Sequence, residues 1–112
     1  MLKVQHNWEQ SILLLRLALA NKEEKFGQTH KQTVKVVDQL AHNLCQLEKY
    51  NELEALFRRI LKATIDDKGL QYEETIKWML LLSRTLYHQK NDEEAELLTK
   101  NILEAVGTNS AK

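Results

Sequence analysis

The sequence contains no proline, and only three of its 112 residues are glycine. Both residues destabilise helix interiors, so their scarcity leaves long stretches that are free to be helical. The single cysteine, Cys45, excludes an internal disulfide, as is typical of proteins in a reducing compartment. Sixteen basic residues balance sixteen acidic ones. This balance argues against a general nucleic-acid binder, because such proteins neutralise phosphates with an excess of Lys and Arg.

No hydrophobic run is long enough to cross a membrane. The most apolar stretch, residues 12–20, is shorter than a bilayer span and carries Arg16 in its middle. Lys3 precedes this stretch as in a secretory signal peptide, but a polar run at residues 21–25 follows where the small residues of a cleavage site would stand. We therefore expect no membrane insertion and a cytoplasmic location.

Motifs that carry catalysis or bind cofactors are also missing. The sequence has no glycine-rich phosphate loop, no zinc-spaced pair of cysteines and no paired-carboxylate motif with an identifiable pocket. His42 and Cys45 are three residues apart and would share one helix face, but two candidate ligands do not make a metal site. Nothing marks them as a nucleophilic pair either, since an oxyanion hole and an orienting third residue are both lacking. We expect no enzyme activity, no catalytic residues, no metal and no cofactor.

What the sequence does contain is an internal repeat with a period of 42 residues. The matching positions keep one register without a gap, which two unrelated amphipathic helices rarely do. Repeats of this length are typical of arrays of small helical units. The matches include Gly27 with Gly69, Thr33 with Thr75, Lys35 with Lys77, Leu40 with Leu82, Leu44 with Leu86, Leu56 with Leu98, Ile60 with Ile102 and Leu61 with Leu103, and further upstream Leu14, Arg16 and Leu19 with Leu56, Arg58 and Leu61.

Each repeat contains two segments in which apolar residues recur at positions i, i+3, i+4 and i+7, the spacing of one helix face. We expect helical hairpins at residues 28–69 and 70–107, and a single helix at 7–27 that aligns with the second helix of a repeat. Residues 1–6 would form an extension and residues 108–112 a tail. This pattern predicts an all-α protein of about five helices. The predicted core residues are Leu40, Leu44, Phe57, Ile60, Leu82 and Leu86.

Polar residues and glycines mark the expected helix ends. A Ser, Thr, Asn or Asp followed three residues later by Glu or Gln resembles the capping box of a helix start. Glycine commonly ends a helix, because it adopts the left-handed conformation easily. The candidate starts are Thr29 with Gln32, Asn51 with Glu54, and Asp92, and the candidate ends are Gly27, Gly69 and Gly107.

The segment THKQTVKVVDQLAHNLCQLEKYNELEALFRRIL (residues 29–61) resembles tetratricopeptide repeats of the kinesin light chain type. The period of 42 also matches that subtype and is longer than the usual period of about 34 in such repeats. The likeness extends from Trp8 to Val106 and implies a solenoid of stacked helical hairpins. The paired asparagines with which that family grips a peptide backbone are replaced here by Asp38-Gln39 and Leu80-Leu81. The resemblance therefore implies the fold and not the cargo of the family.

In that family the first helix of each hairpin lines a concave surface. Such a surface, as the resemblance places it here, carries three fixed positive charges against one carboxylate. We expect it to bind an acidic protein or peptide segment, because Lys and Arg pair with carboxylates and exposed Leu and Tyr side chains anchor apolar ones. An ordinary solvated helix face is the alternative. The family pattern places Lys35, Asp38, His42, Cys45, Gln46, Lys77, Leu80, Arg84, Tyr87 and His88 at the concave positions.

The first predicted helix is apolar around more than one face, which favours neighbours on two sides. It would lack its own hairpin partner or dock on another chain, and a cap folded back on the solenoid is the remaining alternative. We therefore keep a second predicted function, a structural subunit or homo-oligomer assembled through this helix. The candidate association surface consists of Trp8, Ile12, Leu13 and Leu17.

Overall fold

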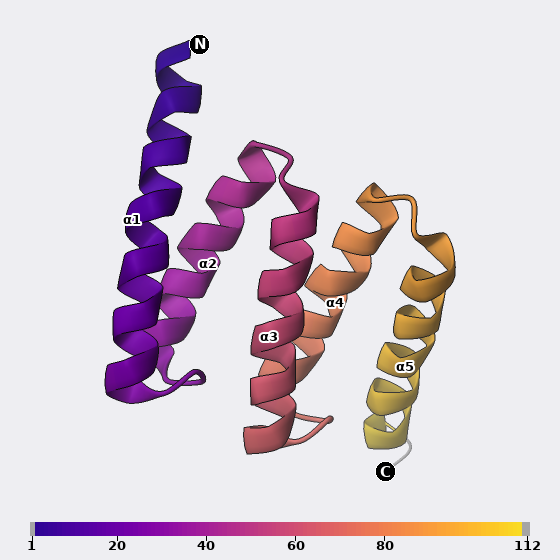
Figure 1. Ribbon diagram of the computed structural model, residues 1–112. Coiled ribbons are helices and arrows are strands. Elements are labelled where there is room, and N and C mark those ends of the chain that lie inside the picture. Colours follow the sequence, from indigo (N-terminus) through magenta and orange to yellow (C-terminus); the bar gives the residue numbers. More distant parts are fainter. Residues whose placement is uncertain (1, 111–112) are drawn as a thin grey trace. The chain divides into compact units, whose positions relative to one another are not determined.

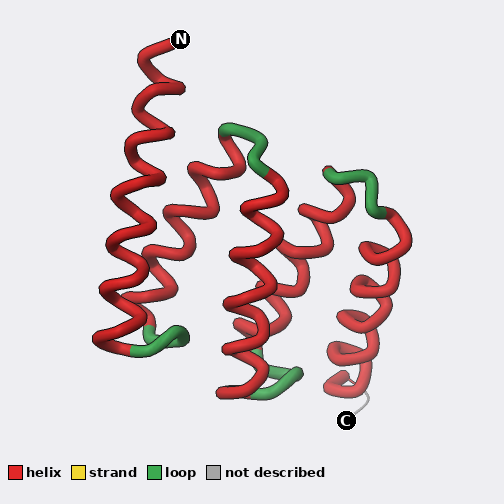
Figure 2. Tube along the Cα trace, in the orientation of Figure 1, coloured by secondary structure: helices red, strands yellow, loops and turns green. Residues whose placement is uncertain are grey.

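The computed structural model describes the backbone of residues 2–110 and the side chains of residues 7–107. It contains five α-helices in this range, joined by short loops (Figures 1 and 2). The described residues contain no strand. The prediction of an all-α protein with about five helices is therefore confirmed. The helices are α1 (Leu2–Phe26), α2 (Lys31–Gln46), α3 (Tyr50–Lys68), α4 (Glu73–His88) and α5 (Asp92–Ser110).

The chain divides into two compact units, Met1–Leu56 and Phe57–Lys112, which we call unit 1 and unit 2. In unit 1, α1 packs on α2, and in unit 2, α4 packs on α5. The first residues of α3 belong to unit 1 and the others to unit 2. The repeat limits 28–69 and 70–107 stay a prediction.

The buried side chains recur at helical spacing along each helix. Trp78, which lies off the principal apolar stripe of α4, is fully buried, and the centroid of its indole ring lies 6.0 Å from that of Phe57. Burial of such large apolar side chains supplies most of the free energy that favours folding. The prediction of the core is confirmed, since all six of its residues are buried: Leu40, Leu44, Phe57, Ile60, Leu82 and Leu86.

The same local geometry returns after 42 residues. α1 and α3 both end at a glycine with positive φ, Gly27 at 91° and Gly69 at 90°, so these two predicted helix ends are confirmed. The hydroxyls of Thr33 and Thr75 each donate a hydrogen bond of 2.7 Å to the carbonyl oxygen of the glycine six residues earlier. Both threonines are fully buried. The repeated Gly and Thr therefore build one type of helix–loop–helix junction, once in each unit.

The predicted helix starts are wrong by one or two residues. α2 is capped by His30 instead of Thr29, because the imidazole Nδ1 of His30 accepts a hydrogen bond of 3.1 Å from the backbone N–H of Gln32. Asn51 lies inside α3, which already begins at Tyr50. Asp92 is the first residue of α5 and not its cap, since the carbonyl of the residue before it accepts the first helical hydrogen bond.

The outer ends of the chain also differ from the prediction. α1 begins at Leu2, so residues 2–6 continue the helix that was expected to start at residue 7. α5 runs through Gly107 to Ser110, and this glycine does not have a positive φ. Gly107 is thus not a helix end, because glycine permits the left-handed turn without requiring it. Met1 and residues 111–112 lie outside the described residues.

Candidate functional site

The predicted binding residues of unit 2 lie on one side of α4. Their spacing of three, four and seven residues places them on a single helix face, opposite the buried Thr75, Met79 and Leu86. Two large apolar side chains, Leu80 and Tyr87, are about half exposed there, beside exposed polar groups. We call this surface the outer face of α4. It consists of Lys77, Leu80, Arg84, Tyr87 and His88.

The two cations of the outer face of α4 have different surroundings. The Nζ atom of Lys77 lies 4.5 Å from the centroid of the Trp78 ring, a distance typical of a cation–π interaction. Lys77 is only half exposed, and part of its side chain covers the indole. The guanidinium of Arg84 belongs to an exposed residue. Arg84 is therefore the cation that is best placed to pair with a bound carboxylate.

The predicted residues of unit 1 are all exposed on α2, and one of them contacts α1. The ring of His42 meets the ring of Trp8 edge to face, with centroids 5.5 Å apart and an interplanar angle of 70°. His42 therefore belongs to the packing between these two helices as well as to the surface. The five exposed residues are Lys35, Asp38, His42, Cys45 and Gln46. That they share one concave surface with the outer face of α4 stays a prediction.

The predicted association surface on α1 is narrower than expected. Ile12 and Leu19, seven residues apart, are both buried in unit 1, where α1 packs on α2. Ile12 is therefore a core residue, which corrects its assignment to the association surface. Leu13 and Leu17 are exposed, together with Leu14 between them. An apolar patch of three neighbouring leucines remains on the other side of α1.

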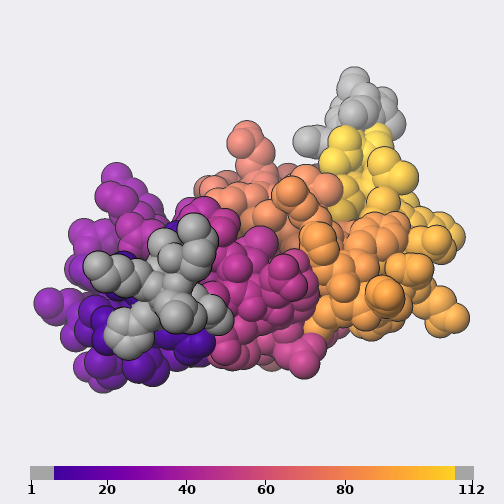
Figure 3. Space-filling model, turned by 90° about the horizontal axis from the view of Figure 1, so that it is seen from above, coloured from indigo at the N-terminus to yellow at the C-terminus, as the bar shows by residue number. Residues whose placement is uncertain are grey.

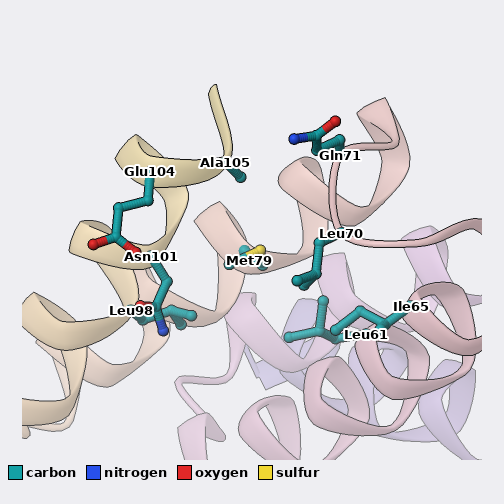
Figure 4. A pocket seen from close by; sticks show the side chains of 9 residues that line it. All are labelled: Leu61, Ile65, Leu70, Gln71, Met79, Leu98, Asn101, Glu104 and Ala105. Carbon is teal, nitrogen blue, oxygen red and sulfur yellow. The ribbon is translucent and has the colours of Figure 1, made fainter. Parts of the chain in front are cut away.

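An apolar groove in unit 2 was not predicted from the sequence. It has a volume of about 550 Å³, and three helices and a loop form its walls (Figure 4). Figure 4 shows Met79 of α4 between side chains of α3 and side chains of α5. The apolar lining is Leu61, Ile65, Leu70, Met79, Leu98 and Ala105, and the polar lining is Gln71, Asn101 and Glu104.

The residues that line the groove limit which chemical groups it can bind. The apolar side chains provide area for burial, and Glu104 is the one charged group among the lining residues, so the groove favours apolar or basic groups over acidic ones. No histidine, cysteine or lysine lines it. The groove thus has the character of an apolar contact surface. Leu70 is the residue that could have indicated the groove from the sequence, because it is an apolar residue next to a loop glycine. In the structure its side chain is exposed.

Comparisons with known proteins assign no family. The chain matches no protein-family model and no curated protein.

Few groups of the described residues are arranged for chemistry. No three His, Cys, Asp or Glu side chains of this part of the chain gather closely enough to hold a metal ion. Desolvation, together with the nearby charges of Glu48 and Cys45, raises the pKa of the Tyr50 phenol above its ordinary value of about 10. None of the helices described here is long and apolar enough to span a bilayer.

Proposed function

We propose that this chain is a non-enzymatic protein-interaction module, a short solenoid of tetratricopeptide-type hairpins, that binds an acidic partner segment on the outer face of α4. One observation carries the proposal. A helix whose inner side is buried presents Leu80 and Tyr87 to solvent beside the exposed Arg84. Exposed aromatic and aliphatic side chains next to an arginine are common at the centre of protein-binding surfaces.

The chemistry of this face selects the partner. Covering Leu80 and Tyr87 removes apolar surface from water, which favours binding by about 25 cal/mol for each Å² that becomes buried. Arg84 can form two parallel hydrogen bonds with one carboxylate, which gives preference for Asp or Glu near an apolar residue. An amphipathic or extended peptide segment with an acidic residue combines both properties. The proposed setting is the cytoplasm, with no cofactor and no nucleic acid.

A charge reversal in the full chain tests the proposal. Arg84→Glu should weaken the binding of acidic peptides by about tenfold or more and leave the helical content unchanged, because Arg84 is exposed. Lys62→Glu is the matched control, since it makes the same change of charge at an exposed position of α3. The measurement is a titration of fluorescent acidic and basic peptide pools against the three proteins. The proposal fails if acidic peptides bind the parent and the Arg84→Glu variant equally well.

A second function, a structural subunit that assembles through α1, is favoured by the exposed side of that helix. Leu13, Leu14 and Leu17 are each more exposed than buried and lie within two turns of one another. Contiguous apolar patches of this kind often mark an interface with another chain. In this role the chain would form a homo-oligomer or a part of a larger complex, and the size of the protein in solution distinguishes the two functions.

A further inference from the structure

The groove of unit 2 combines exposed apolar surface with polar side chains that have no partner. Leu98 of α5 is half-buried and Leu70 is exposed, although both line the groove. α5, which forms one wall, lies at the rim of unit 2, in orange to yellow in Figure 3. Among the described residues, no hydrogen-bond or ion-pair partner engages the side chains of Gln71, Asn101 and Glu104. The oxygen atoms of these three side chains are therefore available to a ligand.

The residues that line the groove differ in kind from their equivalents one repeat earlier. At two positions the groove has an aliphatic residue where the equivalent residue is polar, and at its acidic position the equivalent residue is basic. The equivalent pairs are Ile65 with Glu23, Leu70 with Gln28, Asn101 with Arg59, and Glu104 with Lys62. The helical repeat therefore does not require an apolar and acidic lining at these positions.

The helices that follow a repeat in the chain do not cover this side of it. α3 shows this, because α4 and α5 follow it within unit 2. Arg59 and Lys62 of α3 are the equivalents of Asn101 and Glu104, and both are exposed. A continuation of the repeat thus leaves this side of a helix open, and the groove can receive a ligand from solvent.

The volume and the lining of the groove suit a small molecule with a positive charge. A volume of about 550 Å³ lies within the range of about 300–1,000 Å³ that is typical of small-molecule sites. Such sites are mostly apolar and orient their ligand with a few polar groups. The Glu104 carboxylate attracts a cation, and the amide oxygens of Gln71 and Asn101 can accept hydrogen bonds from an ammonium group, which has only donors.

We infer that the groove of unit 2 binds a small apolar molecule that carries one ammonium group. The hydrocarbon part of the ligand covers Leu70 and Leu98, and its ammonium group pairs with Glu104. The apolar contact supplies most of the affinity, and the ion pair selects the sign of the charge, because exposed pairs are weak by themselves. The inference is independent of the proposed function, because the groove and the outer face of α4 share no residue.

Ligands with the same hydrocarbon chain and different head groups test the inference. The full chain is titrated at neutral pH with octylammonium, octanoate and octanol, each below the concentration at which it aggregates. The methyl signals of Met79 and Leu98 are followed by NMR, which gives both the affinity and the location. Octylammonium should bind saturably and about three- to tenfold more tightly than octanoate, with octanol between them.

Substitutions separate the charge from the apolar contact. Glu104→Gln should abolish the preference for octylammonium and Glu104→Lys should reverse it, whereas Glu96→Gln, at an exposed position of α5 outside the groove, should preserve it. Leu70→Gln should weaken the binding of all three ligands by about threefold or more. Leu97→Gln is the matched control, because Leu97 is a similarly exposed leucine that does not line the groove.

Three results would overturn the inference. The first is the absence of saturable binding, and the second is a preference for octylammonium that is missing in the parent or persists in Glu104→Gln. The third is a basic peptide with apolar residues that shifts the same methyl signals and binds more than about tenfold more tightly than octylammonium, since a protein segment would then be the occupant.

Discussion

Shortening Leu82 to alanine should destabilise the protein much more than the same change at Leu80, two residues away on α4. Leu82 is 2% exposed and Leu80 is 53% exposed. Removing a buried leucine side chain costs about 2–5 kcal/mol, from the lost transfer free energy of its methyl groups and from the cavity that remains. At Leu80 the removed atoms are largely solvated, and alanine favours the helix slightly, so we expect a change within about 0.5 kcal/mol.

Urea denaturation followed by far-UV circular dichroism measures both changes. Because domains of this size hold only about 5–15 kcal/mol in total, Leu82→Ala should shift the midpoint clearly or prevent folding. Leu80→Ala is a matched control for helix, residue type and substitution. If the two variants unfold within about 0.5 kcal/mol of each other, α4 does not face the core as described, and the assignment of its outer face fails as well.

Two further pairs of substitutions test the fold and the surface of α1. Gly69→Ala should destabilise the protein by about 1 kcal/mol, because its φ of 90° disfavours any residue with a Cβ atom, although no atom lies within 4 Å of the added carbon. Gly107→Ala should instead stabilise the protein by up to about 1 kcal/mol, since this glycine lies inside α5. Thermal melts measure both changes. Changes of the same sign would contradict the assignment of Gly69 to a helix end and of Gly107 to a helix interior. Replacing both Leu13 and Leu17 by glutamate should give a monomer with unchanged helical content if α1 mediates association, as light scattering can measure. A parent chain that is already monomeric at high concentration would exclude that function.

The helices and the core could be predicted because both depend on spacing. Buried residues such as Leu40 and Leu82 recur at helical intervals and again after 42 residues, so two independent periodicities indicate the same positions. The helix starts could not be placed to the residue. A cap is decided by one side-chain hydrogen bond, and the imidazole of His30 provides it where Thr29 was expected.

The surfaces were harder to predict than the core. α1 is apolar on several sides, so its sequence does not indicate that Ile12 faces α2 while Leu13 faces solvent. The groove forms because Leu61 of α3 and Leu98 of α5 lie apart from each other, with Met79 of α4 between them. No local sequence pattern specifies this separation between two helices. In contrast, the outer face of α4 follows directly from helical periodicity once Leu82 and Leu86 are placed in the core.

Mapping a bound acidic peptide on the protein by NMR tests the proposed function most directly. The account predicts that the backbone amide signals of Leu80, Arg84 and Tyr87 shift on titration, and that those of Leu61 and Leu98 in the groove do not. Shifts confined to the groove, or no shift at a peptide concentration that saturates the parent in the fluorescence titration, would contradict binding on the outer face of α4.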